Sequence, residues 1–199
     1  MKRINKRDEL IQVGRKIIAQ YGFKAASLND ILTTAGIPKG SFYYYFDSKE
    51  DFGLAIVDDF ARDYRDRFER ILGDKRYSPL TRLRNYFELK IADMAECGCT
   101  DGCLIGNLAQ ELSAQNELFR DRLSLVFAEW EQYFFRCLQA ANKTGEIFLT
   151  SDRQLNLAKF ILASWEGAIL QAKVTKSVLP MEIFVSILFE QILIKSPSS

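Results

Sequence analysis

The sequence predicts an all-α protein, and three observations lead to that fold class. Apolar residues recur every three to four positions in successive segments, as they do on the buried side of amphipathic helices. No segment shows the strict alternation of a β-strand, and internal repeats are not apparent. Apolar residues make up 48% of the 199 residues, which is sufficient for the chain to bury a core of its own.

Start and stop signals place the individual helices. Ser27 and Asp30 form an S-x-x-D start signal for a short helix, which Gly36 ends. Pro38 opens a second short helix, where its missing N–H costs little. The remaining helices are predicted over residues 8–21, 48–72, 79–96, 104–113, 116–142, 152–175 and 180–195.

The segment from residue 36 to 50 combines cations, hydroxyls and aromatic rings more densely than a core helix needs. Phe42 and Phe46 lie four residues apart on a face suited to burial, so the polar donors fall on the other face. Two short helices joined by a tight turn form a helix-turn-helix, whose second helix enters the DNA major groove. The alternative, a helix with a solvated aromatic edge, leaves three consecutive tyrosines without a partner.

Several residues of this segment have the chemistry for contacting DNA. Lys39 and Ser41 can donate to base acceptors or phosphates, and Gly40 lets the DNA backbone come close. The hydroxyls of Tyr43 and its neighbours are suitable phosphate donors. Lys49 opens the next helix, where its ammonium and nearby backbone N–H groups can hold one phosphate.

Five motifs stand together in the first fifty residues. They are Tyr21-Gly22-Phe23, Ala26-Ser27-Leu28-Asn29-Asp30-Ile31, Ala35-Gly36-Ile37, residues 39–46 (KGSFYYYF) and Ser48-Lys49-Glu50. With these motifs the sequence resembles the TetR family of one-component transcriptional regulators, although many members have histidine where this chain has Tyr45. The resemblance implies DNA contacts at Ser27, Lys39, Gly40, Ser41, Tyr43, Tyr44 and Lys49.

The domain organisation follows from the same resemblance and from the charge pattern. We expect a helix-turn-helix DNA-binding domain over residues 1–47 and a helical effector-binding and dimerisation domain over residues 48–199. The overall formal charge is +1, but residues 1–50 hold nine basic against five acidic residues. A basic head on a mildly acidic body favours nucleic-acid binding by the head.

Composition excludes several classes of protein. No apolar run approaches the roughly 20 residues that span a bilayer, and the N-terminus lacks a secretory apolar core, so we expect a cytoplasmic protein. Because the chain contains no histidine, Ser-His-Asp catalysis, Cys-His catalysis and the commonest zinc sites are excluded. With no phosphate-binding glycine loop or carboxylate dyad either, we expect neither an enzyme nor a cofactor.

The last two predicted helices carry more apolar surface than a single bundle readily covers. Gly167 and Ala168 would allow another helix to approach closely. A helix-turn-helix protein also gains from a two-fold partner, since its operator is then a near-palindrome. The family resemblance implies the same homodimer, formed by a four-helix bundle of these helices.

Three cysteines, Cys97, Cys99 and Cys103, cluster where two predicted helices meet. Cys103 falls in the first turn of the second of these helices, where the helix dipole favours a thiolate. The segment around Cys103, together with Gln171-Ala172-Lys173, resembles a TetR branch that includes repressors of electrophile and aldehyde detoxification genes. In that branch the cysteine lies near the small-molecule cavity, which would place Lys173 close to it.

Three interpretations of the cysteine cluster stay open. The thiols are small buried hydrophobes, a sensor of electrophiles, or ligands of a thiolate metal site. The spacing C-x-C-x-x-x-C lacks the paired C-x-x-C motifs of structural zinc sites. A noncovalent apolar effector is also possible, in a cavity lined by residues such as Asn107 and Trp165.

Two classes of function compete for the whole chain. The preferred one is a ligand-responsive transcriptional regulator, released from its DNA operator by a small molecule or a thiol-reactive electrophile. Within this class, a thiolate metal-responsive regulator is the alternative for the effector. The other class is an architectural DNA-binding protein without an effector, or a helical enzyme without DNA function. Effector-sensitive binding to a specific operator would separate them.

Overall fold

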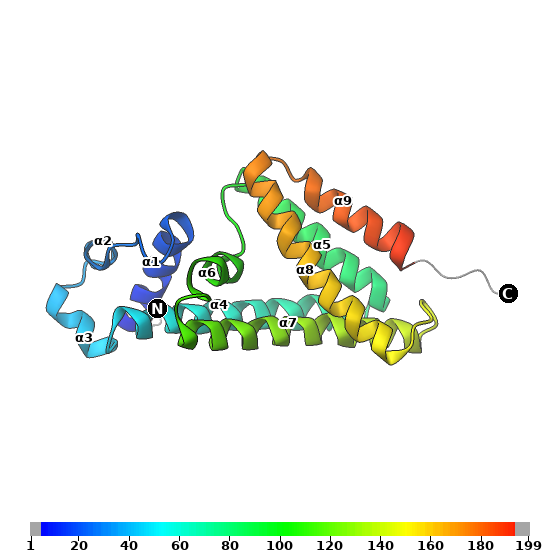
Figure 1. The fold of residues 1–199 in the computed structure, drawn as a ribbon, viewed down its shortest axis with the longest axis horizontal. Helices are drawn as coiled ribbons and strands as arrows, with labels where there is room; N and C mark the ends of the chain where they lie inside the picture. The colour runs from blue at the N-terminus through cyan, green and yellow to red at the C-terminus, as the bar shows by residue number, and fades with distance from the viewer. Residues whose placement is uncertain (1–4, 194–199) are drawn as a thin grey trace. The chain divides into compact units, whose positions relative to one another are not determined.

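The computed structural model describes residues 5–193, and every regular element in that range is helical (Figure 1). The all-α prediction is confirmed. The elements in chain order are α1 (Lys6–Tyr21), α2 (Leu28–Thr34), the 3-10 turn η1 (Lys39–Ser41), α3 (Phe42–Tyr45), α4 (Lys49–Leu72), α5 (Pro79–Glu96), α6 (Leu104–Leu112), α7 (Glu117–Lys143), α8 (Ser151–Thr175), α9 (Leu179–Ile187) and the π-helical turn η2 (Leu188–Ile192).

The chain forms two compact units that each combine separate stretches of sequence. The first unit consists of Met1–Asp63 and Leu104–Ser124, and the second unit of Tyr64–Cys103 and Leu125–Ser199. The long helices α4 and α7 therefore contribute residues to both units. These units describe packing, whereas a boundary at residue 47 divides the chain by function, and that boundary stays a prediction.

In the first unit, α1 packs closely on α4 because Gly14 has no side chain. A Cβ atom at Gly14 would come within 2.3 Å of Cζ of Phe52. Phe52 is fully buried and meets the rings of Phe42 and Phe46 at centroid distances of 5.7 and 4.9 Å. These aromatic contacts attach α3 and its C-cap to the start of α4.

The second helix of the helix-turn-helix is shorter than predicted. Pro38 precedes η1, and α3 ends at Tyr45 because the backbone of Phe46 is extended, with φ −144° and ψ 133°. Phe46 therefore does not share a helix face with Phe42, although both are buried. Packing on Phe52, rather than helical periodicity, keeps Phe46 inside.

The core of the second unit is built on aromatic rings. Phe68 of α4 is fully buried, and its ring lies 4.9 Å from Tyr86, 4.8 Å from Tyr133 and 5.6 Å from Phe134. This cluster ties α4 to α5 and α7. Ring pairs of this kind stabilise a core beyond the area that they bury.

The last helices, α8 and α9, pack side by side in the second unit (orange and red in Figure 1). The predicted helix 180–195 is not uniform, because α9 gives way to η2 after Ile187. In this wider turn the N–H of Leu193 donates to the carbonyl of Leu188 at 2.9 Å, five residues back. Residues 194 and 195 lie outside the described part of the chain.

None of the helices between residues 5 and 193 combines the length and apolar character needed to cross a bilayer.

Candidate functional site

The surface predicted to contact DNA, called the recognition surface below, is the exposed side of η1 and α3 in the first unit. Tyr43 is 65% exposed and Tyr44 is 85% exposed, whereas Phe42 between this surface and the core is fully buried. The two exposed rings place phenol hydroxyls, which can donate to phosphates, at the surface. The predicted separation into a buried phenylalanine side and an exposed tyrosine side is present in the structure.

Gly40 lies on this surface and is not required by the packing of the protein. A Cβ atom added at Gly40 would meet no other atom within 4 Å, and the residue does not have the positive φ that favours glycine. Lys39 beside it is exposed. Neither packing nor backbone conformation therefore requires a glycine here, and the predicted DNA contact at Gly40 stays a prediction.

Ser27 and Lys49 are both occupied by contacts inside the protein. The Ser27 hydroxyl accepts from the backbone N–H of Asp30 at 3.4 Å and caps α2, as predicted. The Lys49 ammonium donates to the carbonyl of Ala26 at 2.6 Å, and its nitrogen lies 5.0 Å from the ring centre of Phe23. Partial burial lowers the pKa of Lys49. Lys49 thus anchors the loop before α2, and its predicted phosphate contact stays a prediction.

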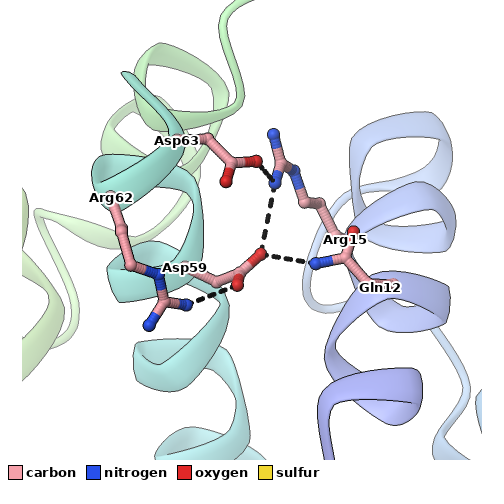
Figure 2. A network of polar contacts seen from close by, with 5 residues as sticks. All are labelled: Gln12, Arg15, Asp59, Arg62 and Asp63. Atoms are coloured by element: carbon pink, nitrogen blue, oxygen red, sulfur yellow. Dashed lines mark hydrogen bonds and ion pairs between the residues drawn. The ribbon is translucent and has the colours of Figure 1, made fainter. Parts of the chain in front are cut away.

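A polar network joins α1 to α4 within the first unit (Figure 2). The carboxylate of Asp59, 8% exposed, accepts from Gln12 Nε2 at 2.8 Å, Arg15 Nη1 at 3.2 Å and Arg62 Nη2 at 2.6 Å. Arg15 also pairs with Asp63. Because Gln12 and Arg15 lie one turn apart on α1, the two helices are fixed in register.

Glu111 of α6 holds the loop between α1 and α2. Its two carboxylate oxygens accept from the backbone N–H groups of Phe23 at 2.8 Å and Lys24 at 2.7 Å. The Phe23 ring packs edge-on against Phe119 of α7 at 5.0 Å. This role was not predicted, since a single acid in an amphipathic helix carries no signal for it.

In the second unit, the cysteine segment between α5 and α6 is tightly folded. Cys99 has a left-handed backbone with φ 54°, and its carbonyl accepts from the Lys176 ammonium at 3.2 Å. Cys97 Sγ donates to the carbonyl of Met94 at 3.3 Å. Cys103 is 5% exposed and lies directly before α6, rather than within its first turn.

The side-chain partner of Cys103 is a carboxyl group. Glu166 of α8 forms a side-chain hydrogen bond with Cys103, in which the thiol donates to a carboxylate oxygen. Burial raises the pKa of Glu166 to about 7, while the thiol and the Lys90 ammonium act in the opposite direction. Glu166 therefore changes charge near neutral pH, in a chain without histidine.

Lys90 of α5 connects this pair to further polar groups. It forms a side-chain hydrogen bond with Tyr64 of α4, and its ammonium lies 3.5 Å from Asp93 Oδ2. Asp93 in turn accepts from Arg67 Nη1 at 2.6 Å. Burial raises the pKa of Tyr64. The result is a cluster of ionisable groups inside the second unit, reaching from α8 through α5 to α4.

The other predicted effector residues lie in different surroundings. Trp165 is 2% exposed, and its ring packs on Phe87 at 4.7 Å and Phe184 at 5.3 Å, so it belongs to the core. Asn107 lies on α6 in the first unit, and Lys173 lies in the last turn of α8. Lys176, not Lys173, donates to the cysteine segment. Effector contacts by Asn107, Trp165 and Lys173 stay predictions.

Glu166 and Lys90 were not predicted from the sequence. A signal existed for Glu166, because it interrupts an otherwise uncharged stretch of α8 from Phe160 to Leu170. Charged residues are rarely placed in such a stretch without a partner. Lys90 gave no comparable signal, since its neighbours Glu88 and Asp93 make it look like part of a solvated face.

A cavity of about 180 Å³ opens between α4, α5 and α7 of the second unit. Its lining includes Phe68, Arg82, Tyr133 and Cys137, but none of the predicted effector residues. Burial raises the pKa of the Cys137 thiol to about 12, which keeps it protonated. In the described range, 5–193, no group of three or more acidic or cysteine side chains is arranged to hold a metal ion.

An exposed apolar stripe runs along α8 and continues on α9. On α8, Phe160, Leu170 and Val174 recur at helical spacing and are 50, 47 and 75% exposed. Gly167 lies on the same stripe, and a Cβ atom added there would meet nothing within 4 Å. On α9 the stripe comprises Leu179, Ile183 and Ile187.

Comparison with known protein families shows to which family this chain belongs. Residues 10–56 match the family "Bacterial regulatory proteins, tetR family", and residues 79–188 match "Tetracyclin repressor-like, C-terminal domain". The chain belongs to the TetR family of transcriptional regulators. The predicted resemblance is confirmed, and the family consists of DNA-binding helix-turn-helix regulators rather than enzymes.

Named relatives of this TetR-family chain are similar along most of its length. It is 35% identical to the HTH-type transcriptional repressor DhaR of Mycobacterium sp. strain GP1, over 97% of this chain and 95% of that one. It is 34% identical to the transcriptional regulator AcuR of Cereibacter sphaeroides, over 88 and 80% of the two chains.

Solved TetR-family structures have the same fold. A regulatory protein TetR from Rhodobacter sphaeroides superposes with a TM-score of 0.87 at 32% identity, covering 93% of this chain and 97% of that one. The reduced form of Escherichia coli NemR superposes with a TM-score of 0.86 at 28% identity, covering 98% of each chain. NemR is itself named a transcriptional repressor.

Proposed function

We propose that this TetR-family regulator is a repressor that leaves its operator when a small molecule or a thiol-reactive electrophile reaches the Cys103 region. Relatives named repressors, including DhaR and NemR, support repression rather than activation. The hydrogen-bonded Cys103–Glu166 pair supports a sensor that involves the thiol. The protein would act in the cytoplasm, where its operator is.

The helix-turn-helix is proposed to contact DNA through the exposed side of η1 and α3 and the starts of α2 and α4. Its operator would be a near-palindrome, because the apolar stripe on α8 and α9 suits a two-fold homodimer. The open space at Gly40 favours close contact with the DNA backbone. The proposed DNA-contacting residues are Ser27, Lys39, Gly40, Ser41, Tyr43, Tyr44 and Lys49.

The observation that carries the proposal is the position of two neighbouring residues on α4. Asp63 pairs with Arg15 of α1, whereas Tyr64 is hydrogen-bonded to Lys90 in the ionisable cluster around Cys103. Asp63 and Tyr64 are consecutive residues of α4, whose helical geometry fixes their relative positions, so a displacement of Tyr64 would also displace Asp63. An effector that prefers one arrangement of this helix would shift the balance between DNA-binding and released shapes.

The proposal is tested by titrating operator DNA with parent and Cys103→Ser protein, before and after treatment with N-ethylmaleimide. The parent is expected to lose operator affinity by about 5- to 150-fold after treatment, the usual range of allosteric coupling. Cys103→Ser should keep its affinity. Cys137→Ser is the matched control, since Cys137 is also buried but is held protonated and bonded to the carbonyl of Pro79 at 3.1 Å.

Equal loss of operator affinity by Cys103→Ser and the parent would show that Cys103 is not the sensor. If neither protein binds a palindromic operator, the proposed DNA-reading mode fails as a whole. The salt dependence of operator binding gives a second measurement on the DNA-contacting residues. Lys39→Ala should lower the slope of log affinity against log salt by about one, the change expected for one lost phosphate contact.

A further inference from the structure

The cavity of about 180 Å³ between α4, α5 and α7 contains two cations that the proposed operator release does not use. Arg82 of α5 and Arg136 of α7 both line it, together with the rings of Phe68 and Tyr133. The whole lining belongs to the second unit, and Cys103 is not part of it. This cavity is therefore a different place from the cysteine segment.

The guanidinium of Arg82 is only partly used by the protein. Its Nη1 donates to the carbonyl of Leu72, the last residue of α4, at 2.8 Å. Its Nε is buried and has no hydrogen-bond partner in the described range, residues 5–193. Capping the end of α4 explains the Nη1 contact but leaves Nε unexplained. A buried donor without an acceptor is costly, so such a group calls for an acceptor from outside the chain.

Carboxylates near the cavity are occupied by donors other than these two arginines. Glu69, which lines the cavity, accepts from the hydroxyl of Tyr133 at 2.8 Å. Glu146 acts on the thiol of Cys137 in the lining, but it accepts from Ser78 Oγ at 2.6 Å. The lining thus holds two guanidinium groups and one carboxylate, which leaves an excess of one positive charge.

This positive charge reaches both the interior and the mouth of the cavity. Burial raises the pKa of the Cys137 thiol to about 12, and the charge of Arg82 opposes that rise. The Arg136 guanidinium lies 5.7 Å from the ring centre of Tyr133, and Arg136 is exposed to solvent. An exposed residue in the lining lies where a cavity meets solvent. A ligand can therefore enter past Arg136 and reach Arg82.

We propose that this cavity is a binding site for small organic monocarboxylates, separate from the site at Cys103. The guanidinium edge formed by Nε and Nη2 of Arg82 matches the two oxygens of a carboxylate. Phe68 and Tyr133 supply apolar walls for the rest of the ligand. An apolar cavity of about 150 Å³ holds benzene, whereas drug-sized ligands take roughly 300–1,000 Å³. The ligand is consequently a single ring or a short chain that carries one carboxylate.

Isothermal titration calorimetry of the full chain with sodium benzoate tests this site without DNA, and so independently of the proposed operator release. A ligand of about nine heavy atoms is expected to bind with a dissociation constant on the order of 0.1–1 mM. Benzamide has the same shape without the charge, and inorganic phosphate has charge without the ring. Both should bind at least about tenfold more weakly. Benzamide or phosphate that binds as tightly as benzoate would overturn the proposal.

Variants locate the bound benzoate. Arg82→Met and Arg136→Met should each weaken binding about tenfold, and Ala140→Leu should weaken it by filling the cavity while both arginines stay. Arg153→Met is the matched control, since Arg153 is an exposed arginine near the start of α8, and it should bind benzoate like the parent. Circular dichroism checks that each variant folds.

Arg82→Met also removes the contact to the end of α4, so this variant alone does not decide the outcome if it fails to fold. Arg136→Met and Ala140→Leu leave that contact in place. Benzoate binding that both of these variants retain at parental affinity would overturn the proposal, because the ligand would then lie elsewhere on the protein.

Discussion

Inside each of the two units, α4 is held by a different balance of contacts. In the first unit, α1 and α4 are joined by ion pairs around Asp59, most of whose partners reach solvent. In the second unit, α4 is fixed by the fully buried Phe68 among three aromatic rings. Partly exposed ion pairs are individually weak and are easily exchanged for water, whereas an aromatic core is not.

This difference shows where a regulator can change shape at low cost. In the first unit, the helices before α4 contact it through the buried rings of Phe42 and Phe46 on Phe52 and through the polar network around Asp59, and only the polar contacts are readily exchanged for water. The contacts around Phe68 are rigid, but the ionisable groups of Glu166 and Lys90 lie inside the same unit. We expect a change in charge there to leave the aromatic core around Phe68 in place, and the polar network around Asp59 to be the more easily rearranged of the two.

The largest expected effect on stability comes from the aromatic core of the second unit. Phe68→Ala removes a fully buried ring and should lower the free energy of unfolding by about 3–5 kcal/mol. Leu125→Ala on α7 is the control, because Leu125 is 61% exposed, and it should change stability by less than about 0.5 kcal/mol. Urea unfolding followed by circular dichroism measures both. Similar losses in the two variants would contradict the aromatic core.

A second prediction concerns the charge inside the rigid unit. Glu166 has a pKa of about 7 in the folded protein against a reference value of 4.5. Because the folded state holds its proton more tightly, stability is full below pH 4.5, falls as pH rises to 7 and is constant above. Glu166→Gln should thus exceed the parent in stability at pH 8, by at most about 3 kcal/mol, and lose that advantage near pH 4.5.

The measurement is urea unfolding of parent and variant at pH 4.5, 6 and 8. Cys137→Ser, at a buried thiol whose pKa of about 12 keeps it neutral in this range, should show no pH-dependent difference from the parent. A difference between Glu166→Gln and parent that is the same at all three pH values would show that the carboxyl does not titrate in the fold.

On the adjustable side, Asp59 and Asp63 should differ in importance. Asp59→Ala leaves Gln12 and Arg62 without their acceptor and should cost about 2 kcal/mol, because the side chain of Asp59 is only 11% exposed. Asp63→Ala removes a side chain that is 52% exposed and should cost less than about 1 kcal/mol. Thermal or urea unfolding of both variants ranks them, and a reversed order would mean that α1 depends on the outer ion pair.

The smallest effect on stability is expected at the recognition surface. Gly40→Ala adds a methyl group that meets no protein atom, so the unfolding free energy should stay within about 0.5 kcal/mol of the parent. If DNA approaches there, operator affinity should fall by about 1 kcal/mol, or roughly fivefold. Fluorescence anisotropy with a labelled operator measures this loss. Unchanged affinity would move the DNA contact away from Gly40.

The positions of most helices and the presence of a helix-turn-helix could be predicted from the sequence, because both depend on local signals. Spacing of apolar residues located α4 to within one residue, and the S-x-x-D signal at Ser27 is an actual cap. The end of α3 was predicted wrongly because Phe46 lies outside the helix but is still buried. Apolar periodicity cannot distinguish a buried residue inside a helix from a buried residue just after it.

The partners of individual side chains could not be predicted, since they come from distant parts of the chain. Lys49 looked free for a phosphate, yet its ammonium is bound to the carbonyl of Ala26. Lys173 was expected near Cys103 from the resemblance to a branch of the family, and that stays a prediction; Glu166, two turns earlier on the same helix, is the side chain that interacts with the thiol. Residues 166 and 173 lie two turns apart on nearly the same face of α8, and spacing alone does not fix which level of the helix lies beside the cysteine.

The distribution of tryptophan gives this protein an optical probe of one unit. Its two tryptophans, Trp130 and Trp165, both belong to the second unit, where Trp130 stacks on Tyr64 at 4.8 Å. The aromatic residues of the first unit are all phenylalanine or tyrosine. Tryptophan emission therefore reports on the surroundings of Tyr64 and α8, and melting of the DNA-reading helices alone would leave it unchanged. Emission and operator binding, recorded on the same unlabelled sample, can time the two halves of the response separately.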